Sequence, residues 1–107
     1  MRLVNKTDTT VALSGATSSD VLNLTGAKSL SIQCVIDVTT PTGATVKLEK
    51  SNNGTSFSDV AAATAISADG TVWFEISDPT YKYARLTYAL SSGSMTSSNH
   101  IVIKSYV

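Results

Sequence analysis

The feature that most constrains this chain is an alternation of apolar and polar residues with a period of two, clearest in the segment SLSIQCVIDV at residues 29–38. Successive side chains of an extended strand point to opposite faces, so this segment has one apolar and one mostly polar face. The apolar face carries Leu30, Ile32, Cys34, Ile36 and Val38. A strand with one apolar face must pack against a second layer, and the sequence therefore predicts an all-β protein.

Similar segments recur along the chain, and no segment keeps a helical stripe of apolar residues for three turns. Further strands are predicted at 45–51, 57–60, 64–66, 71–76, 82–90 and 100–107, with shorter ones at 10–14 and 20–25. Turn residues separate them at intervals of about 8 to 12 positions, a spacing typical of sandwiches and jelly rolls. We therefore predict a single antiparallel β-sandwich domain, jelly-roll-like, of about eight strands over residues 1–107.

Three segments are predicted to lie outside the strands. In NNGTS at 52–56, the pair Asn53 and Gly54 suits the positive φ angles of a tight turn. The segment MRLVNK at 1–6 is a possible N-terminal arm. Residues 91–98 combine Gly93 with small polar side chains over a long connection, which favours a mobile loop.

Charge and composition exclude several classes of partner. The 107 residues include 8 basic and 8 acidic ones, and the basic ones are scattered, so no patch for nucleic-acid phosphates is predicted. No apolar run approaches the length of a membrane-spanning helix. Charged residues make up only 15% of the chain, so Ser and Thr supply most of the polar surface. Short hydroxyl side chains lose little rotamer entropy against another protein, which favours a component of an oligomer or lattice.

Few residues are available for catalysis or metal binding. His100 is the only histidine and Cys34 the only cysteine, so neither a typical zinc site nor a disulfide within the chain is predicted. The sequence also has no nucleophile elbow of the G-x-S-x-G type. The carboxylates lie mostly in turns, where Asp commonly caps backbone groups. A pair of carboxylates in a cleft, as glycoside hydrolysis would require, remains an alternative. We expect no catalytic residue, no metal and no cofactor, and Cys34 should be a small buried hydrophobe. The start of the chain shows no secretory signal, so folding in a cytoplasm is expected.

Trp73 is the residue that the alternation leaves unexplained. In DGTVWFEI at 69–76, Val72, Phe74 and Ile76 form the apolar face, which puts Trp73 on the polar face with Glu75. A large aromatic side chain on a polar face is expected to cover a neighbouring strand, a partner subunit or a ligand. The sequence allows three interpretations, which are packing within the chain, a contact with another subunit or a capsid, and a small ligand.

A hairpin across the SDPT turn would give Trp73 specific neighbours. If 71–76 paired with 81–88 so that Phe74 opposed Ala84, Trp73 would lie opposite Arg85 and Glu75 opposite Tyr83. The four outward side chains would then form a cluster held by cation-π and cross-strand contacts. Trp, Tyr and Arg are the residues enriched at binding hot spots, so this cluster is a candidate interface.

The passages VKLEKSNNGTSFSDV, ISADGTVWFEISD and YKYARLTY, which follow one another within residues 46–89, resemble the small jelly-roll β-sandwich proteins of tailed bacteriophage virions, especially capsid decoration or cement proteins. The same order is similar to discoidin-like and carbohydrate-binding sandwiches, from which Asn53, Phe57 and Ala84 depart. The resemblance to decoration proteins implies a trimeric sandwich that sits at local three-fold points of a capsid and ties neighbouring capsomers together.

We therefore expect a non-enzymatic structural virion protein on the capsid surface, made in the host cytoplasm. Its expected partners are copies of itself, in the homotrimer that the resemblance implies, and the major capsid protein. Neither nucleic acid nor membrane is expected as a partner. The predicted interface residues are Leu3, Val4, Trp73, Glu75, Tyr81, Tyr83 and Arg85. The alternative is a carbohydrate-binding module or a phage tail or adhesin domain, in which Trp73, Tyr81 and Tyr83 would stack on sugar rings.

Overall fold

A computed structural model describes residues 2–12 and 15–105, and of residues 2–4, 11, 12 and 16 it describes the backbone only. All regular structure in these residues is β-strand. No helix in this part of the chain has the length and apolar character needed to cross a bilayer. The strands are β1 (Arg2–Ala12), β2 (Gly15–Ser18), β3 (Leu22–Asn23), β4 (Ala27–Thr42), β5 (Ala44–Ser51), β6 (Ser58–Asp59), β7 (Thr64–Ile66), β8 (Gly70–Ser77), β9 (Tyr83–Leu90) and β10 (Ser92–Ser105).

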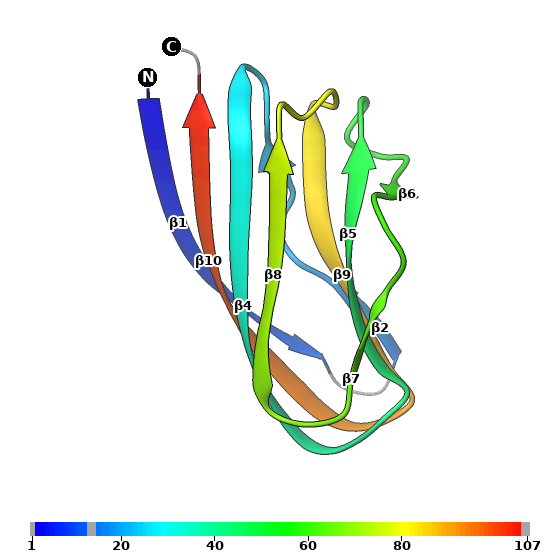
Figure 1. The fold of residues 1–107 in the computed structure, drawn as a ribbon. Helices are drawn as coiled ribbons and strands as arrows, with labels where there is room; N and C mark the ends of the chain where they lie inside the picture. The colour runs from blue at the N-terminus through cyan, green and yellow to red at the C-terminus, as the bar shows by residue number, and fades with distance from the viewer. Residues whose placement is uncertain (1, 13–14, 106–107) are drawn as a thin grey trace.

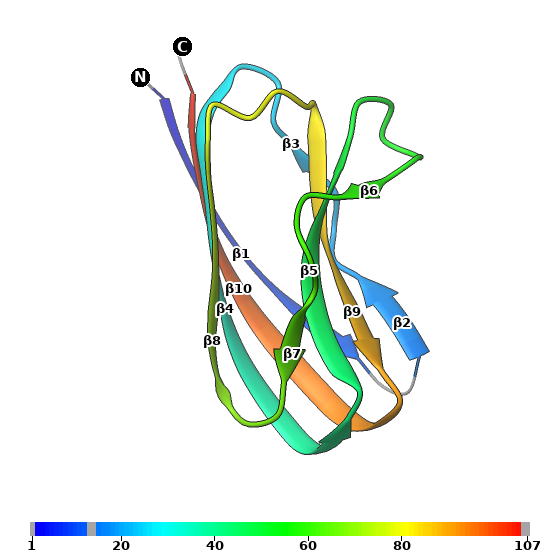
Figure 2. The same ribbon diagram turned by 45° about the vertical axis from the view of Figure 1, so that its right-hand side comes forward.

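The strands form two antiparallel sheets that face each other (Figures 1 and 2). Sheet A has the order β1-β10-β4-β8, and sheet B has the order β2-β9-β5-β6, with β3 also paired to β9 and β7 to β5. The short strands β2 and β3 lie along one strand position, and β6 and β7 lie along another, which leaves eight positions in the two layers. The chain passes repeatedly from one sheet to the other, as in a jelly roll, and the predicted β-sandwich is confirmed.

The core lies between the two sheets and follows the period of two read from the sequence. In β4 the inward side chains from Leu30 to Ile36 are at most 1% exposed, and the outward ones between them are half-buried or exposed. In β9 the inward residues Ala84, Leu86, Tyr88 and Leu90 are likewise buried. Each fully buried aliphatic side chain stabilises the fold by about 1.5 to 3 kcal/mol, so these two central strands carry much of the apolar stabilisation.

The prediction of a mobile loop at 91–98 is wrong. From Ser92 onwards the chain belongs to β10, which pairs with β4 on one side and with β1 on the other. Met95, Ser97 and Asn99 point inward and are buried. The segment alternates like the other strands, but the alternation is not visible in its hydrophobicity. The inward residues Ser97 and Asn99 are polar, and they form hydrogen bonds inside the sandwich.

The N-terminal arm predicted at 1–6 is also absent from the described part of that segment. Residues 2–6 are the first half of β1 and pair with β10 in register from Arg2 opposite Ser105 to Lys6 opposite Ile101. The side chains of Leu3 and Val4, which were predicted to lie in an interface, fall outside the described residues. The backbone of this segment is thus part of sheet A rather than free to reach a neighbouring molecule.

The turn predicted at 52–56 is confirmed and is stiffened by its own side chains. Gly54 has a φ of +79°, in the left-handed region that favours glycine. The Ser51 hydroxyl donates to Asn53 Oδ1 at 2.9 Å and accepts from the Gly54 amide at 2.9 Å. Asn53 Oδ1 also accepts from the amides of Thr55 and Ser56, at 2.9 and 2.8 Å. The loop therefore has a defined shape before any partner binds.

Candidate functional site

Trp73 lies on the outer face of sheet A and remains 55% exposed. It sits in the edge strand β8 opposite Gln33 of β4, and Thr71 lies opposite Val35. Val35 points to the same outer face and is 38% exposed. We call the patch formed by Gln33, Val35, Thr71, Trp73 and Glu75 the Trp73 surface. Val35 was not predicted as a site residue, although an apolar residue among the polar positions of SLSIQCVIDV was the available signal.

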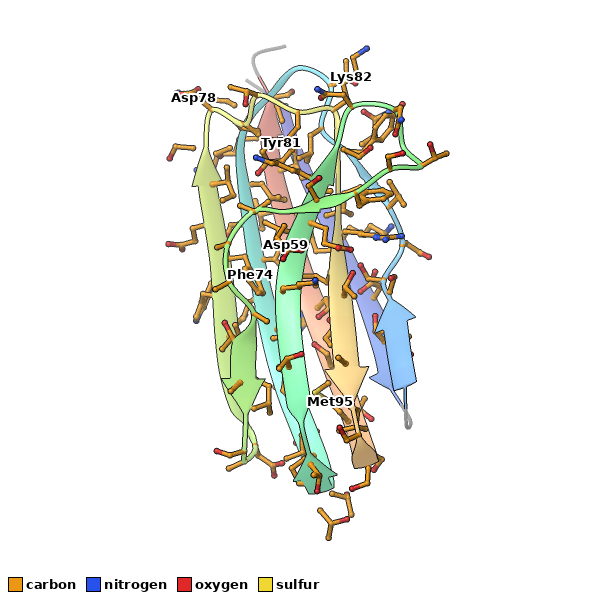
Figure 3. All side chains as sticks on the ribbon, turned by 90° about the vertical axis from the view of Figure 1, so that its right-hand side faces the viewer. Asp59, Phe74, Asp78, Tyr81, Lys82 and Met95 are labelled. Atoms are coloured by element: carbon orange, nitrogen blue, oxygen red, sulfur yellow. The ribbon has the colours of Figure 1, made fainter. Side chains whose placement is uncertain are left out.

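The inward side of β8 is also incompletely covered. Val72, Phe74 and Ile76 are only partly buried, whereas the inward residues of the adjacent β4 are almost fully buried. Opposite β8, sheet B ends in the short strands β6 and β7, joined by a largely exposed segment (Figure 2). Phe74 points from β8 towards this thin side of the sandwich (Figure 3). The β8 edge thus joins an outer patch that exposes Val35 and Trp73 to a partly exposed apolar inner row.

The opposite edge of sheet A, strand β1, is protected by charge. Lys6 and Asp8 lie on the inward-facing side of β1, where Lys6 Nζ is 3.8 Å from Asp20 Oδ2 and Asp8 Oδ1 accepts from Asn99 Nδ2 at 2.9 Å. Inward charges on an edge strand oppose pairing with another chain, because such pairing would desolvate them. In β8 the sole charged residue is the outward Glu75. The two edges of this sheet therefore differ in their readiness to bind a partner.

The predicted cluster of Trp73, Glu75, Tyr83 and Arg85 does not form. Strand β8 pairs with β4 in sheet A, whereas β9 pairs with β5 in sheet B, so Trp73 and Arg85 belong to different layers. The SDPT turn carries the chain between sheets instead of closing a hairpin. The same turn residues suit both connections, and only the pairing of the more distant strands distinguishes them.

Arg85 is instead engaged on the outer face of sheet B. Its Nε donates to Glu49 Oε1 at 2.9 Å, and its guanidinium carbon lies 4.0 Å from the centroid of the Phe57 ring. The Thr87 hydroxyl also donates to Glu49 Oε1, and Lys47 Nζ is 3.8 Å from Glu49 Oε2. Glu49 is only 8% exposed. Burial opposes its ionisation, but the hydrogen bonds from Thr87 and Arg85 and the positive charges nearby outweigh burial and lower its pKa.

This arrangement predicts an acid-sensitive contribution to stability. Because the folded-state pKa of Glu49 is lowered, its contribution is present above the ordinary value of 4.5 and is lost as the pH falls through the folded value. We expect Glu49→Gln to lower the free energy of unfolding by about 1 to 2 kcal/mol at pH 7, with a smaller difference below pH 4.5. Urea titrations from pH 3 to 7 measure this, with the exposed Asp37→Asn as control. Equal losses for Glu49→Gln at both ends of the range would contradict it.

The two remaining tyrosines of the predicted interface occupy different surroundings. Tyr83 is half-buried beside the 52–56 loop, where its ring lies within 3.6 Å of the position that a Cβ at Gly54 would take. Tyr81 is half-buried in the connection between β8 and β9, packs against the core, and has a buried hydroxyl with no hydrogen-bond partner among the described residues. The aromatic residues predicted as one sugar-stacking surface are therefore spread over both sheets and a loop.

A buried polar cluster in the core was not predicted from the sequence. Asn99 of β10 is fully buried, and its Oδ1 accepts hydrogen bonds from the Tyr88 hydroxyl at 3.0 Å and the Ser97 hydroxyl at 2.6 Å. Its Nδ2 donates to Asp8 Oδ1 at 2.9 Å and approaches Thr10 Oγ1 at 3.3 Å. The cluster joins β1 and β10 of sheet A to β9 of sheet B. It therefore fixes both the register within one sheet and the position of the other.

Cys34 lies next to this cluster and is buried, as predicted. Burial raises the pKa of its thiol to about 11. The thiolate is the reactive form of cysteine, so the thiol is inert near neutral pH. No three His, Cys, Asp or Glu side chains gather at a possible metal site within residues 2–12 and 15–105.

Comparison with known proteins identifies a fold but no family. No family model and no curated protein matches this sequence. Among solved structures, a chain from the Bacillus endospore appendages, described as a novel family of disulfide-linked pili, superimposes with a TM-score of 0.58 and 12% sequence identity. The match covers 95% of this chain and 88% of that one. At this identity the likeness establishes a shared β-sandwich fold and nothing more specific.

Proposed function

We propose that this chain is a non-enzymatic structural subunit that associates with copies of itself and is displayed on a larger protein assembly. The observation that carries the proposal is the Trp73 surface beside an edge strand without inward charges. Exposed apolar side chains, here Val35 and Trp73, next to an open strand edge are typical of surfaces that bind another protein. Trp is also the residue most enriched at the centres of such interfaces.

The fold itself is compatible with repetitive assembly, since a chain of disulfide-linked pili has it too. A covalent link of that kind is not expected here, because the single cysteine of this sequence is buried and its thiol is inert. We therefore propose that copies associate non-covalently. A capsid decoration protein, trimeric and bound to the major capsid protein on a virion, is the form of this function that the sequence resemblance implies.

A single outward substitution should separate assembly from folding. We expect the wild-type chain at tens of micromolar to show a mass that is a multiple of 11.2 kDa, and Trp73→Thr to shift it to the monomer. Threonine keeps the strand propensity and removes the exposed indole, so the free energy of unfolding of the monomer should change by less than about 1 kcal/mol. Size-exclusion chromatography with light scattering measures the mass.

Val21→Ser provides a matched control, because Val21 is 44% exposed and lies outside sheet A. It should leave the mass unchanged. A wild-type chain that stays monomeric at these concentrations would count against self-association. An oligomer that survives Trp73→Thr but dissociates in Val21→Ser would place the interface elsewhere.

A further inference from the structure

A polar pocket of about 260 Å³ lies at the end of the sandwich, between the β5–β6 connection and the β8–β9 connection. Figure 3 shows Tyr81 at this end, next to the strands of sheet B. The pocket is lined by the side of Tyr81 and by residues with hydroxyl, amide or ammonium groups, which are Lys50, Ser51, Asn52, Ser56, Ser58 and Thr80. Its size is just below the range of about 300 to 1,000 Å³ of ligand pockets, which suits one small ring.

Lys50 occupies an unusual position at this pocket. It lies opposite the fully buried Ala84 and therefore on the inward-facing side of β5, where the alternation would place an apolar residue. Because it is near the end of the strand, its ammonium group reaches solvent and lies 5.9 Å from the centroid of the Tyr81 ring. Within the described part of the chain, no carboxylate forms an ion pair with it. The pocket thus holds a cation without a counter-ion beside an aromatic ring.

The hydroxyl of Tyr81, a residue that lines the pocket, is a second unpaired group. It is buried, and it has no hydrogen-bond partner among residues 2–12 and 15–105. A buried polar group without a partner costs about 1 to 3 kcal/mol, so a bound water molecule is expected at this hydroxyl. Burial also raises the pKa of Tyr81, so the group is a neutral donor near neutral pH.

Both walls of the pocket are held in place before any ligand binds. On one side, the Ser51 and Asn53 hydrogen bonds set the shape of the β5–β6 connection. On the other side, the Lys82 amide donates to Asn52 Oδ1 at 3.2 Å, and the Asp78 amide donates to the Lys28 carbonyl at 2.7 Å. A binding site with prearranged walls loses little conformational entropy when it is occupied.

We infer that this pocket binds a single sugar ring that carries a negative charge, such as a uronic acid. The hydroxyl and amide groups match the hydroxyls of a sugar, the Tyr81 ring offers an apolar contact, and Lys50 pairs with the acidic group. A nucleotide fits less well, because one lysine supplies little charge for several phosphates. The inference concerns a site on sheet B and its loops, away from the Trp73 surface, so it is independent of the proposed self-association.

The test uses the whole chain labelled with ¹⁵N and three small ligands, which are methyl glucuronide, methyl glucoside and inorganic phosphate. We expect methyl glucuronide at millimolar concentrations to shift the amide signals of residues 50–58 and 80–82, methyl glucoside to bind at least threefold more weakly, and phosphate to give no saturable shift at these residues. Absence of any saturable shift with either sugar up to 50 mM would overturn the site. Equal shifts with phosphate would reduce it to an anion site and overturn the sugar assignment.

Two variants test the roles of the individual groups. Lys50→Gln should abolish the preference for glucuronide over glucoside, whereas the control Lys104→Gln, on the outer face of sheet A, should leave it unchanged. Tyr81→Phe keeps the ring that lines the pocket and removes only the enclosed hydroxyl, so it should leave the affinity for both sugars unchanged within about twofold. Retention of the charge preference in Lys50→Gln would contradict the assignment of that residue.

Discussion

Asn99→Ala is expected to lower the free energy of unfolding by about 3 to 5 kcal/mol. The substitution removes all four hydrogen-bonding contacts of the buried amide, and it leaves the Tyr88 and Ser97 hydroxyls and the Asp8 carboxylate without their partner in the core. It also leaves a small cavity, which adds to the loss. Urea unfolding followed by circular dichroism measures the effect. Ser98→Ala, on the adjacent outward position, is the control and should change stability by less than about 0.5 kcal/mol.

A second substitution at the same position distinguishes a specific hydrogen-bond network from simple packing. Asn99→Asp keeps the shape but places a carboxylate beside the carboxylate of Asp8, and two such groups cannot both ionise readily. The folded state would then bind a proton that the unfolded chain has lost. Stability of Asn99→Asp should therefore rise as the pH falls from 7 towards 5. A decline over this range would contradict the placement of the new carboxylate beside Asp8. A loss below about 1 kcal/mol for Asn99→Ala would show that the amide is dispensable.

Gly93→Ala is expected to destabilise the fold by more than about 3 kcal/mol. Gly93 has a φ of +90° at the point where the pairing of β10 with β4 shifts register, between Ser92 and Ser94. A Cβ at this position would lie against the backbone carbonyl oxygens of Thr39 and Thr40, 2.5 Å from the first of them. These carbonyls lie at the irregular end of β4, where Thr39 pairs with Ser94 and Thr42 with Ser92, so the two strands must separate locally to admit a side chain. The backbone at Thr39 and Thr40 must shift to admit one methyl group.

Two other glycines separate steric clash from backbone strain. Gly26 has a φ of +76° but open space around its Cβ position, so Gly26→Ala should cost only about 1 to 2 kcal/mol. Gly70 has neither a positive φ nor a close neighbour, and Gly70→Ala should be nearly neutral. Thermal and urea unfolding of the three variants gives the order. If Gly93→Ala and Gly26→Ala lost the same stability, the register shift at β10 would tolerate a side chain and the steric argument would fail.

Much of the core could be predicted because it depends on local geometry. The inward row of β4 and the burial of Cys34 follow directly from the alternation of apolar and polar residues at 29–38. The 52–56 turn follows from Asn53 and Gly54, although only the glycine has a positive φ. The segment 91–98 could not be assigned in this way, because its inward residue Ser97 donates to Asn99, and Asn99 depends in turn on hydrogen bonds with Asp8 and Tyr88. These partners lie 91 and 11 positions away from Asn99.

At the candidate site, too, local geometry could be predicted from the sequence and the contacts between distant residues could not. The sequence placed Trp73 on an outward face, and the structure bears this out with an exposed indole. The sequence alone could not identify the neighbours of Trp73, because a turn such as SDPT can close a hairpin or connect two sheets equally well. Lys50 carried a signal of its own, as a charged residue in the apolar row of VKLEKS, but its significance required the position of Tyr81.

By itself, the sequence determined which side of each strand is apolar, because the direction of successive side chains is a property of the extended backbone and needs no knowledge of the rest of the chain. Only the tertiary structure decided which strands are neighbours. Pairing joins residues that are dozens of positions apart, and the choice depends on burying every apolar face and satisfying every inward polar group at once. For that reason Arg85 contacts Glu49 and Phe57 rather than Trp73, and Trp73 remains on an open edge.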